Sequence, residues 1–329
     1  MTATEETNHK RQSRRSGATF VFREDGPMAQ VLQQVEKYAP ISQPVLITGE
    51  TGTGKEQVAK LLHAHSERPG RLVSVNLSAI PHDLIENELF GHLKGSFSGA
   101  DTTTTGYVER ASEGSLFLDE VGDIALQNQV KLLRLIENGV YEKIGSQRSQ
   151  TSTARFIFAT NRLLEDDVAS NRFRSDLYYR ISTFTIFLPS LRERKDDIPL
   201  LIDHFLYYAC DDAGRHTMTI SDEALKRLIQ YDWPGNVREL ENIVYRLVAT
   251  VHTDCIDIEH LPSLFQYDQF VEKKRQFNFH RSKADELEKE LIDMALLQSD
   301  GNLTKAAQIL GMSRNTFQYR LNKTAAGHK

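Results

Sequence analysis

One segment constrains the fold of this chain more than any other: a short apolar run at residues 45–48 leads through a glycine-rich loop into a helix-like stretch at 57–65. The loop reads Gly49, Glu50, Thr51, Gly52, Thr53, Gly54 and Lys55. Its glycines allow backbone amides to turn toward phosphate oxygens, the helix start adds a positive end, and Lys55 supplies a mobile charge. A plain turn is the alternative. The order of strand, loop and helix favours a nucleotide phosphate site, with ATP as the expected ligand.

Four more apolar runs follow, at residues 72–77, 116–118, 156–159 and 184–188. Each is apolar almost throughout, which is typical of a strand buried on both faces. The runs alternate with helix-like stretches, and this rhythm predicts an α/β fold with a parallel sheet covered by helices. After the run at 116–118, residues at helical spacing predict one apolar stripe on a helix: Leu126, Val130, Leu133 and Ile136.

Two acidic residues follow the run at 116–118. A P-loop usually has Ser or Thr after its lysine to hold Mg²⁺, whereas this chain has Glu56 there, so the metal needs another ligand. Asp119 and Glu120 stand at the carboxyl end of a strand, where parallel sheets bind ligands. We expect Asp119 to position Mg²⁺ and Glu120 to polarise the attacking water, with a simple strand cap as the alternative. Asn161, after the next strand, is expected beside the γ-phosphate unless it only forms a turn.

From residue 196 to about 261 the strand pattern stops and helical stretches follow one another, at 198–209, 224–230 and 237–251. This predicts a small helical subdomain. The segment Trp233-Pro234-Gly235 marks a turn into the last of these helices. Asn236 and Glu239 have the spacing of a reciprocal N-cap, in which each side chain satisfies a backbone amide.

The last part of the chain has the spacing of an all-α helix-turn-helix. Leu287, Leu291 and Ala295 form one helical stripe, a second short helix spans 302–310, and Ser313 caps a third helix. Phe317 and Leu321 are expected to pack inward, since they are four residues apart. The third helix is expected to enter the major groove of double-stranded DNA, although a bare three-helix packing unit is the alternative.

The outward positions of that third helix are the candidate DNA contacts. They are Ser313, Arg314, Asn315, Thr316, Gln318, Tyr319, Arg320 and Lys323. Arg314 and Gln318 are candidates for base edges, whereas Arg320 and Lys323 have the character of phosphate contacts. Residues 271–329 carry 11 Lys and Arg against 7 Asp and Glu, whereas the whole chain has a formal charge of −5. This excess favours an anionic polymer only weakly, because a solvated charged face is commoner.

Composition and the remaining motifs exclude several classes of protein. No apolar run approaches the roughly 20 residues of a membrane-spanning helix, so no membrane partner is expected. Residues 1–17 are polar with four basic side chains and no apolar core, which excludes a secretory signal and favours the cytoplasm. Cys210 and Cys255 lie 45 positions apart without a C-x-x-C pattern, so we expect two buried thiols rather than a zinc site.

Over about residues 20–322 the chain resembles the bacterial enhancer-binding proteins, which are AAA+ ATPases that activate sigma-54 RNA polymerase. The most specific marks are the P-loop with Glu56, the segment Glu-Leu-Phe-Gly-His at 88–92, residues 95–100, the segment at 233–240 and the final helix pair. The resemblance implies an AAA+ P-loop parallel sheet with a helical lid subdomain, followed by a Fis-like helix-turn-helix domain.

The resemblance also implies roles for single residues. Members commonly carry Glu after the P-loop lysine, which accounts for Glu56. Asn76 matches the residue that holds the catalytic glutamate, here Glu120, in an inactive pose, and Arg238 matches the lid arginine that senses the γ-phosphate. Arg174 and Arg180 match arginine fingers that reach the adjacent subunit. Such fingers imply a ring of six or seven subunits, of this chain alone or with a related activator, whereas their spacing alone allows plain surface ion pairs.

Residues 95–100 match the loop with which the family contacts sigma-54, usually Gly-Ala-Phe-Thr-Gly-Ala. Here the loop consists of Gly95, Ser96, Phe97, Ser98, Gly99 and Ala100. Phe97 supplies the apolar tip, and Ser98 keeps the hydroxyl while it loses a methyl group. We expect the contact with sigma-54 and its polymerase to survive, while the strength of coupling stays open. A flexible loop without a partner is the alternative.

The predicted division of the chain is a flexible basic arm at 1–17, the ATPase subdomain at 18–188, the lid at 189–265, a linker at 266–283 and the DNA-binding domain at 284–329. The arm is shorter than the roughly 50 residues of a small domain, so no receiver or ligand sensor is expected there. Control is expected from a separate protein that acts in trans on the ATPase domain, from the level of expression, or from a paired activator, as in phage-shock-type members, which lack an N-terminal regulatory domain.

The leading hypothesis is a sigma-54-dependent activator that binds upstream enhancer DNA and uses ATP hydrolysis to convert the closed polymerase complex into an open one. One alternative is a DNA-binding regulator whose vestigial ATPase domain serves only oligomerisation, which intact Lys55, Asp119 and Glu120 disfavour. Another is an AAA+ machine for a different client, such as a helicase or unfoldase, which the loop at 95–100 disfavours.

Overall fold

The computed structural model describes residues 21–23, 25–96, 100–262 and 265, together with positions 292, 295, 296, 299, 302–310, 312, 317, 318 and 321. The chain divides into two compact units, Met1–His260 and Leu261–Lys329, and each is described by itself. The arm predicted at 1–17 and the linker predicted at 266–283 lie outside the described residues.

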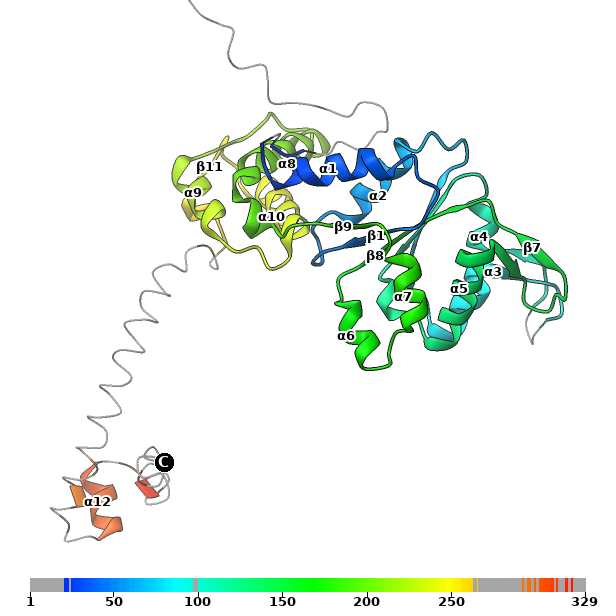
Figure 1. Ribbon diagram of the computed structural model, residues 1–329. Helices are drawn as coiled ribbons and strands as arrows, with labels where there is room; N and C mark the ends of the chain where they lie inside the picture. The colour runs from blue at the N-terminus through cyan, green and yellow to red at the C-terminus, as the bar shows by residue number, and fades with distance from the viewer. Residues whose placement is uncertain are drawn as a thin grey trace, which may run out of the picture. The chain divides into compact units, whose positions relative to one another are not determined.

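A five-stranded parallel sheet forms the centre of the first unit (Figure 1). Its strands lie in the spatial order β2-β5-β8-β1-β9, and every neighbouring pair runs parallel. Their bounds are β1 (Val45–Thr48), β2 (Leu72–Asn76), β5 (Ser115–Asp119), β8 (Arg155–Thr160) and β9 (Thr185–Phe187). The predicted α/β fold with a parallel sheet is therefore confirmed.

The two edge strands differ from the prediction. The central strands β5, β8 and β1 are buried over most of their length. In β2 and β9, by contrast, buried and exposed residues alternate, with Ser74 and Asn76 exposed in β2 and Thr185 and Phe187 exposed in β9. The expectation of burial on both faces is wrong for these two strands, because they lie at the margins of the helical layers that cover the sheet.

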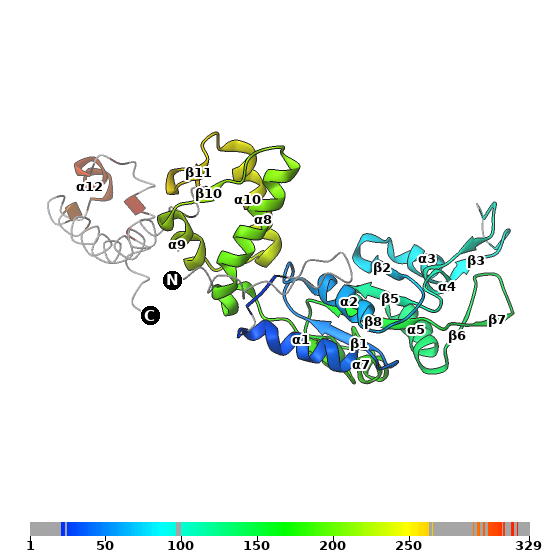
Figure 2. The same ribbon diagram turned by 90° about the horizontal axis from the view of Figure 1, so that it is seen from above.

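Helices cover both faces of this sheet (Figures 1 and 2). On one face, α1 (Pro27–Tyr38) and α2 (Lys55–Ala64) share a core with Val45 and Ile47 of β1. Leu46 joins the core on the opposite face, because successive side chains of a strand point to opposite sides. That face carries α3 (Ile85–Phe90), α4 (Tyr107–Arg110), α5 (Leu126–Asn138), α6 (Leu164–Ala169) and α7 (Ser175–Ile181).

Helix α5 buries a different face from the one its apolar stripe suggested. Its buried residues are Asn128, Gln129, Leu132, Leu135 and Ile136. Of the predicted stripe, Leu126 is 48% exposed and Val130 is 40% exposed, and only Ile136 is fully within the core. Leu132, Leu135 and Ile136 supply the apolar part of the buried face. Gln129 can join it because its amide donates to the carbonyl oxygens of Ile124 at 2.9 Å and Arg172 at 3.1 Å.

Two antiparallel hairpins extend the first unit. The pair β3 (Gly91–His92) and β4 (Thr104–Thr105) brackets residues 95–100, and β6 (Val140–Glu142) pairs with β7 (Ser149–Thr151). A bridge between His92 and Ile144 joins the two hairpins. Short 3-10 helices complete the connections: η1 (Leu77–Ala79), η2 (His82–Leu84), η3 (Val121–Asp123), η4 (Leu191–Asp197) and η5 (Ile258–His260).

The predicted helical subdomain is present in the same unit. It contains α8 (Ile198–Asp212), α9 (Asp222–Gln230) and α10 (Asn236–Thr250), with a parallel pair of two-residue strands, β10 (Thr219–Ile220) and β11 (Cys255–Ile256). Trp233 is buried at the turn before α10 and donates its indole N–H to the carbonyl oxygen of Leu228 at 2.8 Å. The turn predicted from the Trp-Pro-Gly segment therefore anchors the end of α9 against the start of α10.

Two local predictions in this subdomain need correction. The reciprocal cap is only half formed: Glu239 accepts the backbone N–H of Gly235 at 2.8 Å, but Asn236 makes no cap contact and turns its side chain toward the P-loop. Of the two cysteines, Cys210 is buried in α8, whereas Cys255 is exposed. Cys255 is exposed because successive side chains of a strand point to opposite sides, and in β11 (Cys255–Ile256) it is Ile256 that is buried.

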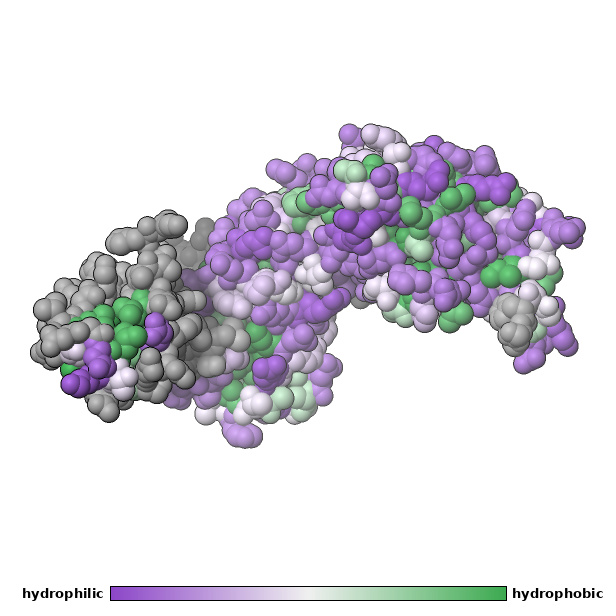
Figure 3. Space-filling model, turned by 90° about the horizontal axis from the view of Figure 1, so that it is seen from below, coloured by the Kyte–Doolittle hydropathy of each residue, from purple (hydrophilic) through white to green (hydrophobic). Residues whose placement is uncertain are grey.

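The second unit contains a small apolar core around α12 (Leu303–Ile309). The core consists of Ile292, Ala295, Ala306, Ala307 and Phe317, and it includes Phe317, which was predicted to pack inward. In the described part of the chain, no helix is both long and apolar enough to cross a bilayer. In the view of Figure 3 the described surface is mostly hydrophilic, with apolar side chains in small scattered groups.

Candidate active site

The loop between β1 and α2 has the backbone that a phosphate cradle needs. Gly52 and Gly54 adopt φ angles of +80° and +105°, in the left-handed region that favours glycine. A Cβ atom on Gly52 would lie 2.3 Å from the carbonyl oxygen of Gly235, so the lid also approaches too closely for any other residue. The glycine at position 52 is thus required both by the loop conformation and by the contact between loop and lid.

Lys55 begins α2 and folds its side chain back into this loop. Its ammonium donates to the carbonyl oxygens of Gly49 at 3.0 Å and Glu50 at 3.4 Å, and it lies 3.7 Å from Oε1 of Glu120. Lys55 is buried. A buried cation held by carbonyl dipoles and one carboxylate can exchange these partners for phosphate oxygens.

Asp119 and Glu120 stand at the carboxyl end of β5, on the P-loop side of the sheet. The backbone N–H of Glu120 donates to Oδ1 of Asp119 at 3.0 Å, and Glu120 has a left-handed φ of +55° that turns the chain into η3. Burial raises the pKa of both carboxyl groups, and the nearby Lys55 charge opposes that rise. The two acids are therefore held close together in a site that penalises their negative charge.

The donor chemistry at Asp119 fits Mg²⁺. This ion prefers hard oxygen ligands and is usually bound by one or two carboxylates together with substrate phosphates, rather than by a cage of protein side chains. Asp119 lines the same pocket as Lys55. Among the described residues, no group of three or more His, Cys, Asp or Glu side chains is placed to hold a metal, so a site here would depend on the phosphates.

Asn161 joins the P-loop to the catalytic strand end. Its side-chain amide donates to Oγ1 of Thr51 at 2.8 Å, and its backbone N–H donates to Oε2 of Glu120 at 3.2 Å. The structure therefore brings together Thr51, Glu120 and Asn161, as expected for residues around a γ-phosphate. Asn76 lies beside Asp119 in the sheet register, and its side-chain oxygen accepts from the amide and hydroxyl of Ser78.

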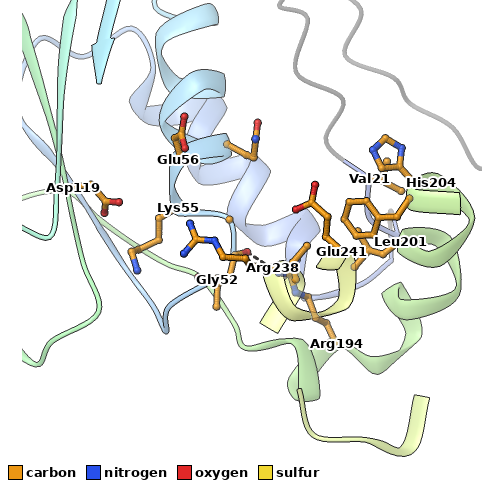
Figure 4. A pocket seen from close by; sticks show the side chains of 15 residues that line it. Val21, Gly52, Lys55, Glu56, Asp119, Arg194, Leu201, His204, Arg238 and Glu241 are labelled. Carbon is orange, nitrogen blue, oxygen red and sulfur yellow. Dashed lines mark hydrogen bonds between the residues drawn. The ribbon is translucent and has the colours of Figure 1, made fainter. Parts of the chain in front are cut away.

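The lid closes the nucleotide pocket from the other side. The pocket has a volume of about 350 Å³ and is lined by P-loop residues, Asp119 and several lid residues. Figure 4 shows Lys55 and Asp119 at one end of it, Arg238 beside Lys55, and His204 of α8 at the other end. The backbone amide of Arg238 donates to the carbonyl oxygen of Gly52 at 3.3 Å. The predicted γ-phosphate sensor, Arg238, is therefore tied directly to the P-loop.

Three lid residues that bind the P-loop were not found from the sequence. Arg192 donates to the carboxylate of Glu50 at 2.9 Å, and Asn236 donates to the same carboxylate at 3.1 Å. These hydrogen bonds, with that of Arg192 the larger, lower the pKa of Glu50. Arg194 is buried and donates to the carbonyl oxygen of Thr53 at 2.9 Å. The sequence signals were the Arg-Glu-Arg-Lys run after β9 for the two arginines and, for Asn236, only the N-cap spacing.

The two predicted arginine fingers lie away from this pocket. Arg174 precedes α7, is exposed, and pairs with Asp176 through contacts of 3.0 and 2.6 Å. Arg180 is half-buried in α7, and its guanidinium approaches the carbonyl oxygen of Ile136 at 3.5 Å. Neither side chain lines the pocket that contains Lys55.

Of the predicted sigma-54 loop, the structure describes Gly95, Ser96 and Ala100, whereas Phe97, Ser98 and Gly99 lie outside the described residues. The N–H of Gly95 donates to the carbonyl oxygen of Ala100 at 2.8 Å, which closes the base of the loop. A Cβ on Gly145 would lie 2.5 Å from Cβ of Ser96. The loop base therefore packs tightly against the turn between β6 and β7.

Of the predicted DNA contacts, only Gln318 falls among the described residues, where it is helical and exposed next to buried Phe317. The others lie outside them: Ser313, Arg314, Asn315, Thr316, Tyr319, Arg320 and Lys323. Exposure of Gln318 beside an inward phenylalanine agrees with the predicted outward face of the third helix.

Comparison with known families assigns each part of the chain. Residues 21–187 match the family described as "Sigma-54 interaction domain", residues 192–277 match "AAA+ ATPase lid domain", and residues 278–323 match "Bacterial regulatory protein, Fis family". A central AAA+ ATPase domain with its lid and a DNA-binding helix-turn-helix together define a transcription regulator. The chain belongs to the family of sigma-54-dependent transcriptional activators.

Individual relatives support the same family. The chain is 41% identical over 297 residues to the transcriptional regulatory protein ZraR of Salmonella typhimurium, covering 90% of this chain and 67% of that protein. It is 40% identical over 306 residues to the DNA-binding transcriptional regulator NtrC of Azospirillum brasilense, covering 84% and 63%. It is 40% identical over 305 residues to the nitrogen fixation protein AnfA of Azotobacter vinelandii, covering 92% and 57%. The chain thus spans roughly three fifths of the length of these relatives.

Solved structures give the same fold. NtrX from Brucella abortus in complex with ATP superposes with a TM-score of 0.67 at 31% identity, covering 91% of this chain and 68% of that one. The complex of NtrX with ADP superposes with a TM-score of 0.69 at 30% identity, covering 91% and 68%.

Proposed function

We propose that this protein binds enhancer DNA through its C-terminal helix-turn-helix, assembles into a ring, and uses ATP hydrolysis to convert the closed sigma-54 polymerase complex into an open one. One observation carries the proposal: Lys55, Glu120 and Asn161 converge on the P-loop of the same domain that holds the loop at 95–100. A domain kept only for oligomerisation has no need of such a convergent hydrolytic set.

The chemistry would be transfer of the γ-phosphoryl group to water. Lys55 neutralises phosphate charge once it releases its present carbonyl partners, and Asn161 orients groups around the γ-phosphate. Glu120 takes the proton of the attacking water, since burial raises its affinity for a proton. Asp119 would hold Mg²⁺, which when bound would supply positive charge that offsets the negative charge of the phosphates.

A second positive charge would come from the neighbouring subunit. Arg174 and Arg180 are placed on α7 and its N-terminal flank, away from their own pocket, and supply transition-state charge only if another subunit's nucleotide faces them. This is why the proposal includes a ring, whether of six or seven copies or shared with a related activator.

Hydrolysis would be coupled to the loop through two connections. The lid would respond to the nucleotide through the P-loop, because the amide of Arg238 and the guanidinium of Arg194 both donate to P-loop carbonyl oxygens. The loop at 95–100 rests on the β6–β7 turn, so a shift of that turn would raise or retract Phe97 against sigma-54. Loss of the γ-phosphate would then release the arrangement that ATP stabilises.

We further propose that this work takes place in the cytoplasm and is controlled by a separate protein acting on the ATPase domain. Purified protein would then hydrolyse ATP at an unregulated rate and lose activity when the regulator is added. A requirement for phosphorylation of the chain itself would contradict this part of the proposal.

The experiment that tests the proposal is transcription from a sigma-54 promoter with purified protein, polymerase and ATP. We expect Phe97→Ala to keep ATP turnover within about twofold and to reduce transcription at least about tenfold, as removal of an aromatic contact at a binding hot spot does. Lys55→Ala is the control that abolishes both. Equal loss of turnover and transcription in Phe97→Ala would mean that the loop supports the fold rather than contacting the polymerase.

A further inference from the structure

We propose that Gln129 is a positioning residue for Arg174: it fixes the backbone of the segment carrying this arginine to the turn that follows Glu120. The geometry with which one subunit presents Arg174 to its neighbour would thus be set by that subunit's own catalytic strand end. This inference rests on the proposed function, in which Arg174 acts on the nucleotide of the adjacent subunit.

The side chain of Gln129 joins two segments that are far apart in sequence. Gln129 is 0% exposed, in the first turn of α5. Its amide nitrogen donates to the carbonyl oxygen of Ile124 at 2.9 Å and to that of Arg172 at 3.1 Å. Its amide oxygen accepts the backbone N–H of Arg174 at 2.8 Å. Both donors and one acceptor position of the amide are therefore used in a fixed geometry.

One end of this connection reaches the catalytic strand. Ile124 ends η3, which begins directly after Glu120, and Glu120 receives the N–H of Asn161. A buried amide cannot leave its partners without exposing unpaired polar groups to an apolar core. A shift of the turn after Glu120 would therefore be transmitted to the backbone of Arg174 rather than absorbed by Gln129.

A second, ionic connection runs between the same two regions. Arg162 follows Asn161 in the chain and donates to the carbonyl oxygen of Gly122 at 3.2 Å and to Oδ1 of Asp167 at 2.7 Å. Arg172 donates to that same Asp167 oxygen at 2.8 Å. The segment that precedes α7 is thus held by both an uncharged and a charged link to the strand ends around the γ-phosphate.

The side chain of Arg174 is exposed at the surface, whereas its backbone is held by a hydrogen bond to a buried side chain. Its guanidinium is exposed and pairs with Asp176 only two residues away, whereas its N–H is fixed by buried Gln129. A fixed backbone with a surface guanidinium is the arrangement expected of a residue presented to a partner, because misplacement of about 1 Å can cost catalysis about a hundredfold.

Asn128 provides a matched control for a purely structural role of Gln129. It is the preceding residue of the same helix, is only 2% exposed, and its amide makes no hydrogen bond within the described residues. Substitution by leucine changes a buried amide to an apolar side chain at either position. Only at position 129 does it also remove the link to Arg174.

The test is ATP turnover by mixed rings of the full chain. Gln129→Leu and Arg174→Ala subunits keep a complete site but present no well-placed arginine, whereas Glu120→Gln subunits have an inactive site and an intact arginine. Alone, Gln129→Leu should lose about ten- to a hundredfold in turnover. Mixed in equal amounts with Glu120→Gln, it should recover to about a quarter of the wild-type rate. A productive interface needs the intact site of a Gln129→Leu subunit beside the intact arginine of a Glu120→Gln subunit, and random assembly forms this pair at about a quarter of the interfaces. Asn128→Leu alone should stay within about twofold of wild type.

The controls separate this inference from the proposed function. If Glu120→Gln subunits restore turnover to Arg174→Ala but not to Gln129→Leu, the positioning role is contradicted while the proposed function stands. The same conclusion follows if Asn128→Leu loses as much ATP turnover as Gln129→Leu. Failure to recover Arg174→Ala, or a wild-type chain without turnover, contradicts the proposed function instead. If Gln129→Leu does not fold, as judged by its Tm and by binding of a fluorescent ATP analogue, Gln129→Met takes its place, since methionine keeps the length and shape of the side chain without its hydrogen bonds.

Discussion

At the scale of single residues, the nucleotide site depends on a few positions where geometry permits only one residue type. Gly52 is the clearest case, because its φ of +80° and the 2.3 Å approach of the Gly235 carbonyl oxygen act together. The carboxyl groups of Asp119 and Glu120 are constrained in a different way, because burial raises the pKa of each. The first feature can be tested by nucleotide binding and the second in the nucleotide-free chain.

We expect Gly52→Ala to weaken ATP binding at least about tenfold, because the added methyl group forces the lid away from the P-loop. Gly214→Ala is the matched control: its φ is +61°, but nothing lies within 4 Å of an added Cβ. That control should lose only about 1 kcal/mol of stability to backbone strain and should keep its affinity for ATP. Titration with a fluorescent analogue measures both variants, and equal affinities would refute the steric argument.

The raised pKa of Asp119 predicts a pH-dependent stability in the nucleotide-free protein. A carboxyl group whose pKa is higher in the folded state stabilises the fold at low pH, and this contribution is lost as the pH rises through the folded pKa. Asp119→Asn should therefore have a higher Tm than wild type at pH 8, and the difference should shrink toward the unfolded pKa of about 4.

Asp176→Asn is the control with the opposite sign. The Arg174 guanidinium, by hydrogen bonding, lowers the pKa of Asp176, so this carboxylate stabilises the fold above its unfolded pKa and the contribution is lost as the pH falls. Its replacement should lower the Tm at pH 8 only slightly, because the pair is exposed and solvent-screened. A Tm of Asp119→Asn below that of wild type at pH 8 would contradict the electrostatic account.

At the scale of secondary structure, continuous apolar runs predicted the strands to within one or two residues, because buried parallel strands require such runs. The buried face of α5 could not be predicted in this way. Gln129 is polar, and only the positions of Ile124, Arg172 and Arg174 in the folded chain make it an inward residue. Which strands lie at the edges of the sheet could not be predicted either, because the local sequence of a strand does not determine its place in the spatial order.

The observed face of α5 makes a direct prediction about stability. Val130 is 40% exposed, so Val130→Gln should change the free energy of unfolding by no more than about 0.5 kcal/mol. Leu132 is buried, and Leu132→Ala should lower that free energy by about 2–5 kcal/mol. Urea unfolding at concentrations where the chain is monomeric measures both, and the reverse order would restore the apolar stripe as the buried face.

At the scale of the whole molecule, site residues within one contiguous motif could be predicted from the sequence. Contacts between segments that are distant in the sequence could not. Lys55 was identified because it closes the glycine-rich loop that follows a recognisable strand, and Glu120 because it directly follows another. Arg192 binds Glu50 across 142 positions of sequence, and Asn236 binds it across 186, so only the folded lid brings these partners together.

The central claim is that ATP cleavage, and not ATP binding or DNA binding alone, opens the polymerase complex. The most direct measurement is promoter melting, detected by the chemical reactivity of unpaired thymines, with sigma-54 polymerase and the full chain. Melting is expected with ATP, and should be absent with a non-hydrolysable analogue or with Glu120→Gln. Equal melting in the absence of hydrolysis would contradict the claim and leave a regulator that acts by occupancy of DNA.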